Sequence, residues 1–93
     1  GIRSGLDAAK SIALGASLAG VARPILLSAF KGYEETKRTL STLINQLRNV
    51  MFLVGADSIE KLKKVPLVIL GRTAEWLRAR GFNPEVYARR WVR

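Results

Sequence analysis

Cysteine and histidine are both absent from this 93-residue sequence. Without cysteine the chain can form no disulfide and offers no thiolate, and without histidine it lacks the commonest general base and metal ligand of proteins. Acidic residues are also scarce, with seven Asp and Glu against sixteen Lys and Arg. These carboxylates fall at expected helix starts or exposed helical positions, where capping and solvation account for them. We therefore expect no catalytic residue and no metal ligand in this segment.

The sequence also lacks a long apolar stretch free of interruptions. The nearest approach, residues 12–30, contains Arg23 and is broken by Gly15, Gly20 and Pro24. A central arginine costs about 2.5–3.5 kcal/mol on insertion into a bilayer, against roughly 0.3–0.6 kcal/mol gained per large apolar residue. We expect no membrane span, because buried elements of a globular α/β protein have the same hydropathy.

Aromatic residues make up only 8% of the chain and are not interleaved with its basic residues. A net charge of +9 is typical of proteins that bind nucleic acid or anionic membranes. Here, however, the positive charges are spread along the whole chain, and stacking platforms for bases are missing. We expect no nucleic-acid partner, although a basic helical binding module remains an alternative.

The first 24 residues carry the most informative pattern. Apolar residues recur at helical spacing and predict an amphipathic helix that Gly15 ends: Leu6, Ala9, Ile12 and Ala13. Residues 18–22 then form an apolar run too short for a helix, which predicts a buried strand. This order of loop, helix, strand and loop indicates an α/β fold.

Two arginines lie in the loops of this segment. Arg3 precedes the first helix, and Arg23 precedes Pro24, a residue suited to the first turn of a second helix. In α/β folds, loops at the carboxyl ends of strands face the ligand, and helix starts favour anions. Gly1 would let the backbone approach an anion closely. Together the two turns predict a phosphate-binding site.

The remainder of the chain predicts further helices. The second helix covers residues 24–31 and ends at Gly32, and a long amphipathic helix covers residues 34–54. The long helix carries one apolar stripe: Leu40, Leu43, Ile44, Leu47, Met51 and Val54. It is expected to pack on the core, although a partner- or membrane-binding helix would show a similar stripe.

The last part of the chain predicts short elements. Ser58 would cap a short helix, residues 65–70 would be extended, and residues 72–80 would form a helix with Ala74, Leu77 and Trp76 inward. Asn83 and Pro84 would begin a last helix reaching Arg90. Residues 91–93 are expected to fray.

Several stretches resemble known FMN-dependent enzymes. Residues 1–16 followed by 20–24 look like the last strand pair of FMN-dependent TIM barrels. Residues 47–55, 62–71 and 76–81 are similar to the carboxyl end of type 2 isopentenyl diphosphate isomerases, in an archaeal-like form. The resemblance implies the carboxyl-terminal part of a (β/α)₈ TIM barrel plus a helical extension, mostly helical as a fragment. Residues 1–54 would supply the last βα units, and residues 55–93 a helical extension of the same domain.

The chain is too short for a whole barrel, which takes roughly 250 residues. Because it begins with Gly in the middle of a motif, we expect the last quarter of a longer enzyme, with the catalytic and metal-binding residues upstream.

The resemblance also implies a function. Enzymes of this family interconvert isopentenyl and dimethylallyl diphosphate with reduced FMN, and NADPH, Mg²⁺, a cytoplasmic location and a homo-oligomer (tetramer or octamer) would accompany that activity. Five residues match positions that contact the FMN phosphate: Gly1, Ile2, Arg3, Ala22 and Arg23. Ile2 and Ala22 would contribute main-chain N–H groups. Another FMN-dependent barrel, such as an α-hydroxy-acid oxidase, is the alternative enzyme, since it shares residues 1–24.

Overall fold

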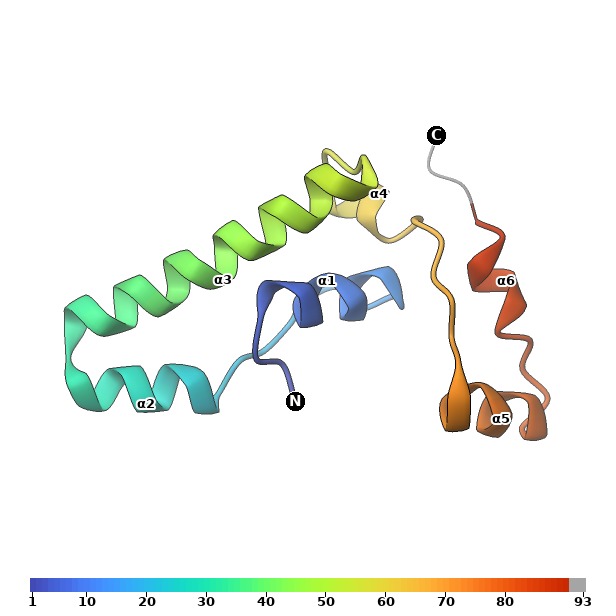
Figure 1. Cartoon of the computed structure of the whole chain (residues 1–93), viewed down its shortest axis with the longest axis horizontal. Helices are drawn as coiled ribbons and strands as arrows, with labels where there is room; N and C mark the ends of the chain where they lie inside the picture. The colour runs from blue at the N-terminus through green and yellow to red at the C-terminus, as the bar shows by residue number, and fades with distance from the viewer. Residues whose placement is uncertain (91–93) are drawn as a thin grey trace.

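The computed structural model of the chain describes residues 1–90 (Figure 1). Within that range all the regular elements are helices, and no residue belongs to a strand. Their order is α1 (Gly5–Ala13), α2 (Arg23–Lys31), α3 (Tyr33–Val54), α4 (Ile59–Leu62), α5 (Gly71–Ala79) and α6 (Glu85–Ala88). The expectation of a mostly helical chain is therefore confirmed.

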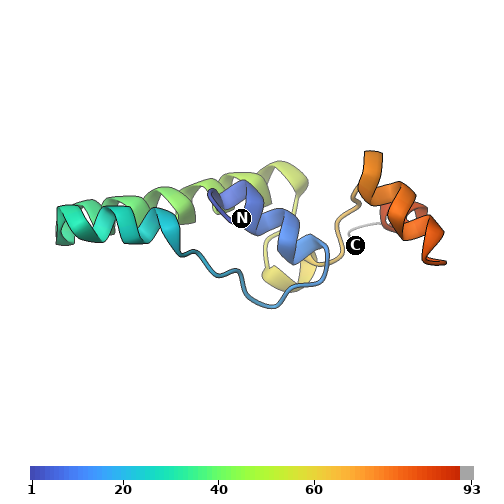
Figure 2. The same cartoon turned by 90° about the horizontal axis from the view of Figure 1, so that it is seen from below.

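The long helix α3 is the element on which the amino-terminal half is built. Both α1 and α2 pack along it, and α4 contacts α1 (Figures 1 and 2). The core between them is small, and Leu62 is its largest fully buried side chain. The buried residues of this core are Ala9, Ile12, Ala13, Ala56, Leu62 and Val65. Partly buried side chains of α3, among them Leu47 and Met51, pack against them.

The helix boundaries follow from capping residues. The Ser4 Oγ accepts the Asp7 N–H at 3.2 Å and begins α1. Glycines with positive φ follow the three main helices, with Gly15 at 119°, Gly32 at 115° and Gly55 at 75°. Residues with a Cβ rarely adopt these angles, so each glycine ends its helix. The three helices predicted in the first 54 residues are thus confirmed to within one or two residues.

The strand predicted for residues 18–22 is not formed. The segment runs as irregular chain from α1 to α2 (Figure 2), and the Leu18 side chain is 88% exposed. A strand needs a neighbouring strand to bond its N–H and C=O groups. Between residues 1 and 90 no second segment forms such a ladder with this one. The β part of the predicted α/β class is therefore absent from the described chain.

The carboxyl-terminal part begins as the sequence predicts. Ser58 caps α4 with its Oγ, and residues 65–70 are extended without belonging to a sheet. In α5 the Ala74 side chain is buried as expected, but Trp76 is 59% exposed. Its ring lies beside the Arg80 guanidinium at 5.3 Å. The inward placement of Trp76 was wrong because none of the elements described packs on that face of α5.

The last helix is shorter than predicted. Asn83 Oδ1 accepts the Glu85 N–H at 3.1 Å, but the N-cap residue is Pro84, so the helix begins at Glu85, one residue later than predicted. The helix ends at Ala88 and does not reach Arg90. Residues 91–93, for which fraying was expected, lie outside the described range.

Arg90 lies just beyond the end of α6, and its guanidinium turns toward the core. It donates to the carbonyl oxygens of Ala13 (2.8 Å), Lys63 (2.9 Å) and Val65 (2.8 Å). The same group lies 4.7 Å from the ring of Tyr87. One side chain therefore joins the segment that follows α6 to the end of α1.

The molecule is elongated, with principal extents of 46 × 30 × 18 Å. Its radius of gyration is 15.4 Å, whereas a compact domain of this length would have about 12 Å. In Figures 1 and 2, α5 and α6 form an arm that stands apart from the α1–α3 layer. No described helix combines the length and the hydropathy that a membrane span requires.

Candidate phosphate-binding site

A cavity of about 680 Å³ opens between the amino-terminal turn and the start of α2. We call it the two-arginine pocket. Its lining residues are Gly1, Ile2, Arg3, Gly20, Ala22, Arg23, Pro24 and Leu27. All five residues that the resemblance assigns to a phosphate site lie on this one cavity, although about twenty residues separate the two turns. The structure thus brings together the groups that the sequence pattern singled out.

The turn that carries Arg3 is fixed by Asp7. The Arg3 backbone N–H donates to Asp7 Oδ2 at 3.0 Å, and this bond is the main reason that the pKa of the Asp7 carboxyl lies below its ordinary value of 3.8. The Ser4 hydroxyl and the Lys10 charge act in the same direction. Because its backbone N–H is already used, Arg3 can serve an anion in the pocket only through its side chain.

The start of α2 is built differently. Its first turn contains Pro24 but no acidic residue, and the N-cap residue Ala22 provides no side-chain hydrogen bond. The first N–H groups of a helix have no partner within the helix, and together with the helix dipole they favour an anion. Ala22 is the N-cap and Arg23 the first residue of α2, and both line the pocket. Main-chain donors and the Arg23 side chain can therefore act on the same ligand.

Neither arginine of the pocket is neutralised by the part of the chain that the structure describes. The guanidinium groups of Arg3 and Arg23 form no ion pair or hydrogen bond within residues 1–90, and both residues are exposed. Two unpaired positive charges on one cavity attract a doubly charged anion. An arginine fork also matches the geometry of phosphate oxygens.

Most carboxylates elsewhere are engaged with basic neighbours. Asp57 Oδ1 lies 2.8 Å from Lys61 Nζ, and this contact lowers the pKa of Asp57. Glu85 pairs with Arg78, whose hydrogen bond lowers the pKa of Glu85. Across residues 1–90, no three side chains of the metal-binding types gather in one place.

Two residues that support the pocket were missed in the sequence. Gly5 is buried and donates its N–H to Gln46 Oε1 at 2.8 Å, so the turn of Arg3 is attached to α3. Gln46 lies on the polar side of a long amphipathic helix, and no signal in the sequence distinguishes it from its exposed neighbours. Pro24 and Leu27 also line the pocket without having been assigned to it.

A second, apolar cavity of about 350 Å³ lies between α1, residues 17–21 and α3. Leu18 and Val21 reach it from the irregular segment, and Leu43 and Ile44 reach it from α3. The side chains expected to make a buried strand therefore line an open apolar surface.

The chain matches the FMN-dependent dehydrogenase family over residues 1–68 and belongs to that family. Within this family, the similar proteins are isopentenyl-diphosphate delta-isomerases. The chain is 49% identical over 90 residues to the isopentenyl-diphosphate delta-isomerase of Methanothermobacter thermautotrophicus, covering 97% of this chain and 26% of that protein. The enzyme of the same name from Metallosphaera sedula is 47% identical over 87 residues, or 94% of this chain and 24% of that protein.

A third relative, the isopentenyl-diphosphate delta-isomerase of Thermococcus onnurineus, is 52% identical over 81 residues, or 86% of this chain and 22% of that protein. The resemblance to archaeal enzymes of this name, inferred from the sequence, is thus confirmed. The chain spans about a quarter of the length of the curated relatives it matches.

Proposed function

We propose that this chain is part of an FMN-dependent isomerase that interconverts isopentenyl diphosphate and dimethylallyl diphosphate. Its contribution is the two-arginine pocket, which holds the phosphate of FMN. The observation that carries this proposal is the meeting of Arg3 and Arg23 on one cavity, each without an acidic partner among residues 1–90. The relatives named isopentenyl-diphosphate delta-isomerase support the reaction.

The pocket residues fit a phosphate monoester. Such a group carries about −1.5 to −2 charges at neutral pH and offers three acceptor oxygens. Arg3 and Arg23 supply two positive charges and several donors, and the start of α2 adds main-chain N–H groups. A cavity of about 680 Å³ is within the usual range for a cofactor site. When bound, reduced FMN supplies the proton movement at the allylic carbons of the substrate.

The finer features of the enzyme rest on the family resemblance. We infer that residues 1–54 form the last βα units of a TIM barrel and that residues 55–93 extend the same domain. The apolar surface around Leu18 and Ile44 supports this, because neighbouring barrel strands would cover it and give residues 18–22 their pairing partners. Catalytic and metal-binding residues would then lie upstream. We also propose, from the family resemblance, that the enzyme uses NADPH and Mg²⁺, forms a tetramer or octamer and is located in the cytoplasm.

Substitution of each arginine in the complete protein tests the phosphate site. Arg3→Ala removes charge-assisted hydrogen bonds worth about 1.5–3 kcal/mol, so the Kd for FMN should rise roughly 10- to 100-fold. Riboflavin lacks the phosphate, and its Kd should stay within about twofold. Arg72→Ala, at an exposed arginine of α5, is the matched control. Fluorescence titration with both flavins measures these constants.

An FMN affinity that Arg3→Ala and Arg23→Ala leave at the level of the Arg72→Ala control would contradict the site. The reaction is tested separately, by following dimethylallyl diphosphate formation from isopentenyl diphosphate in the presence of reduced FMN. Oxidation of a 2-hydroxy acid without isomerisation would favour the alternative FMN-dependent barrel enzyme instead.

A further inference from the structure

We propose that Gln46 and Thr39 of α3 are positioning residues that set the spacing of Arg3 and Arg23 in the two-arginine pocket. The inference rests on the proposed function, since it concerns how the same site is held in shape. Neither Gln46 nor Thr39 lines that pocket. They therefore act on the ligand through the elements that they fix.

The first contact holds the turn of Arg3. The Gly5 N–H donates to Gln46 Oε1 at 2.8 Å across 41 residues of sequence. Gly5 also lies so close to α3 that an added Cβ would come within 2.3 Å of the Leu47 nitrogen and 2.5 Å of the Leu43 oxygen. Only glycine allows this approach. The start of α1 is thus held against α3 by one hydrogen bond and a close backbone contact.

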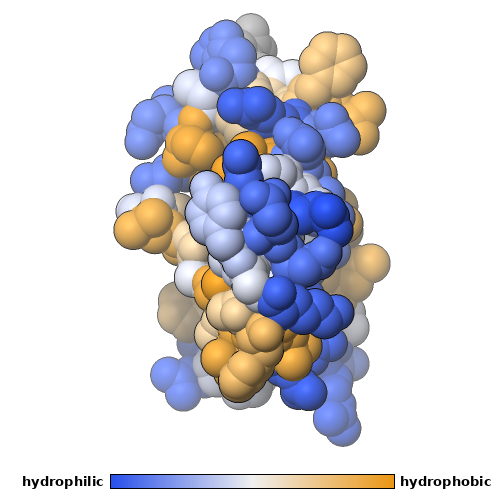
Figure 3. Space-filling view, turned by 90° about the vertical axis from the view of Figure 1, so that its left-hand side faces the viewer, coloured by the Kyte–Doolittle hydropathy of each residue, from blue (hydrophilic) through white to orange (hydrophobic). Residues whose placement is uncertain are grey.

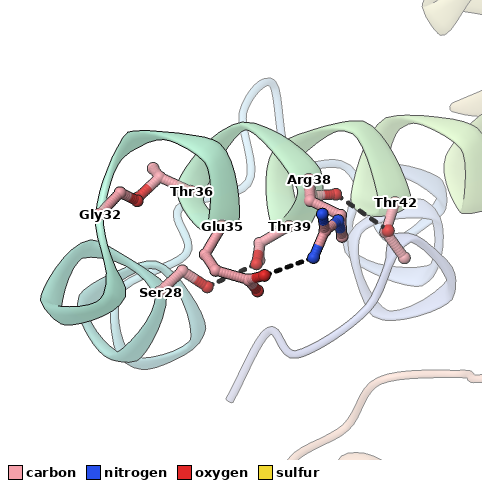
Figure 4. A network of polar contacts seen from close by, with 7 residues as sticks. All are labelled: Ser28, Gly32, Glu35, Thr36, Arg38, Thr39 and Thr42. Atoms are coloured by element: carbon pink, nitrogen blue, oxygen red, sulfur yellow. Dashed lines mark hydrogen bonds and ion pairs between the residues drawn. The ribbon is translucent and has the colours of Figure 1, made fainter.

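The second contact holds the helix of Arg23. Ser28 is 9% exposed, and its hydroxyl donates to the Pro24 carbonyl at 3.0 Å. The Ser28 hydroxyl also shares a hydrogen bond with the Thr39 hydroxyl (Figure 4). Pro24 follows Arg23 directly in the first turn of α2. The Ser28 side chain therefore links the start of α2 to α3.

The two contacts share one face of α3. Thr39 and Gln46 are seven residues apart, which is close to two helical turns and about 10.5 Å along the axis. A small cavity of about 230 Å³ between them confirms the shared face, because Arg3 and Pro24 line it together with Thr39 and Gln46. A rigid helix thus carries both halves of the pocket at a fixed spacing.

The uncharged amide of Gln46 is suited to a position beside Arg3. Its amide oxygen accepts the Gly5 N–H as a carboxylate would, but it adds no negative charge beside Arg3. The positive field of the pocket is therefore kept for the ligand.

The test compares variants of the complete protein by their Kd for FMN and for riboflavin. Gln46→Leu keeps the size of the side chain and removes the acceptor, and Asn45→Leu, at the exposed neighbouring position, is the matched control. We expect Gln46→Leu to raise the Kd for FMN about threefold to tenfold, with riboflavin and the control within twofold. Thr39→Val should act in the same direction, and Thr39→Ser, which keeps the hydroxyl, should restore FMN binding.

Hydrogen exchange of the Gly5 amide supplies a second readout. The amide should lose protection in Gln46→Leu and regain it in Gln46→Glu, which again offers an acceptor. If the wild-type protein prefers FMN to riboflavin and Gln46→Leu keeps that preference in full, the inference is overturned while the proposed function stands. Equal losses for both flavins also overturn it, since they indicate general damage to the fold. A wild-type protein that binds FMN no better than riboflavin contradicts the proposed function itself, and the inference with it.

Discussion

At the residue scale, what the pocket can bind depends on which backbone and side-chain donors are still free to form hydrogen bonds. The Asp7 carboxylate accepts the backbone N–H of Arg3, so the guanidinium is the donor group of Arg3 that remains available to a ligand. At Ala22 and Arg23 the uncapped start of α2 leaves main-chain donors available as well. The two turns therefore contribute different kinds of donor to one cavity.

The Asp7 contact predicts an acid-sensitive contribution to stability. Because the native pKa of Asp7 is lowered, the folded protein binds this proton less readily than the unfolded chain. The stabilisation is complete above the ordinary value of 3.8 and is lost as the pH falls through the lowered native value. Asp7→Asn should remove this part of the pH dependence. Urea unfolding midpoints of the complete protein between pH 5 and 2 measure it.

Glu75→Gln provides the control for that measurement. Glu75 is an exposed carboxylate that forms no ion pair or hydrogen bond in the described part of the chain. If Asp7→Asn and Glu75→Gln change the pH dependence of stability to the same extent, the Arg3–Asp7 contact makes no particular contribution to it.

Arg3 and Arg23 could be predicted as site residues because the signals that single them out are local. An arginine beside a helix start and a proline in the first turn can be recognised within a few positions of Arg3 and Arg23. Gln46 could not be found in this way, because its partner Gly5 lies 41 residues away and their contact depends on helix packing. In the sequence, a polar residue of an amphipathic helix looks the same whether or not it has such a partner.

At the element scale, the helices were predictable and the strand was not. Apolar periodicity and glycines at the ends define α1, α2 and α3, and these features act within each segment. Residues 18–22 have strand-like composition, but a strand forms only when another supplies its hydrogen bonds. The prediction of a strand at residues 18–22 therefore failed because no neighbouring strand pairs with this segment, and the composition of the segment itself is not the reason.

In the carboxyl-terminal arm, one side chain, that of Arg90, reaches the end of α1. Arg90 donates to three carbonyl groups, including that of Ala13 at the end of α1, where a positive charge also complements the helix dipole. We predict that Arg90→Ala releases the arm and speeds hydrogen exchange in α6 and in residues 65–70 about tenfold or more, because charged hydrogen bonds of this kind contribute about 1.5–3 kcal/mol each. Exchange measured by mass spectrometry resolves these segments.

The neighbouring Arg89 gives the comparison for the arm. It is exposed and forms no hydrogen bond within the described chain, so Arg89→Ala should leave exchange in the arm nearly unchanged. Equal exchange in the Arg90→Ala and Arg89→Ala variants would show that the three carbonyl contacts do not hold the arm.

At the scale of the whole molecule, the chain leaves much apolar surface open. Its accessible area is 7113 Å², whereas a compact monomer of 10.3 kDa would expose roughly 5,400 Å². The excess, about 1,700 Å², is roughly twice the 800 Å² that each partner buries in a stable protein interface. On the α2 end of the molecule, Leu26, Leu27 and Phe30 are more than half exposed, and Figure 3 shows hydrophobic side chains gathered below hydrophilic ones there.

This open surface predicts the behaviour of the 93 residues on their own. A core whose largest fully buried side chain is one leucine should not support a cooperative fold. The isolated chain should therefore unfold gradually on heating and bind the dye ANS, as expected for exposed apolar surface. Calorimetry and ANS fluorescence at micromolar concentration measure both properties. A sharp transition of a monomer with little ANS binding would disprove this prediction.

The central claim is that Arg3 and Arg23 jointly hold the phosphate of FMN. The most direct measurement is the ratio of the Kd for riboflavin to the Kd for FMN in the complete protein and in its Arg3→Ala/Arg23→Ala variant. We expect a ratio well above 10 in the wild-type protein and a ratio near one in the double variant, with riboflavin binding retained. A double variant that keeps the wild-type ratio would contradict the claim.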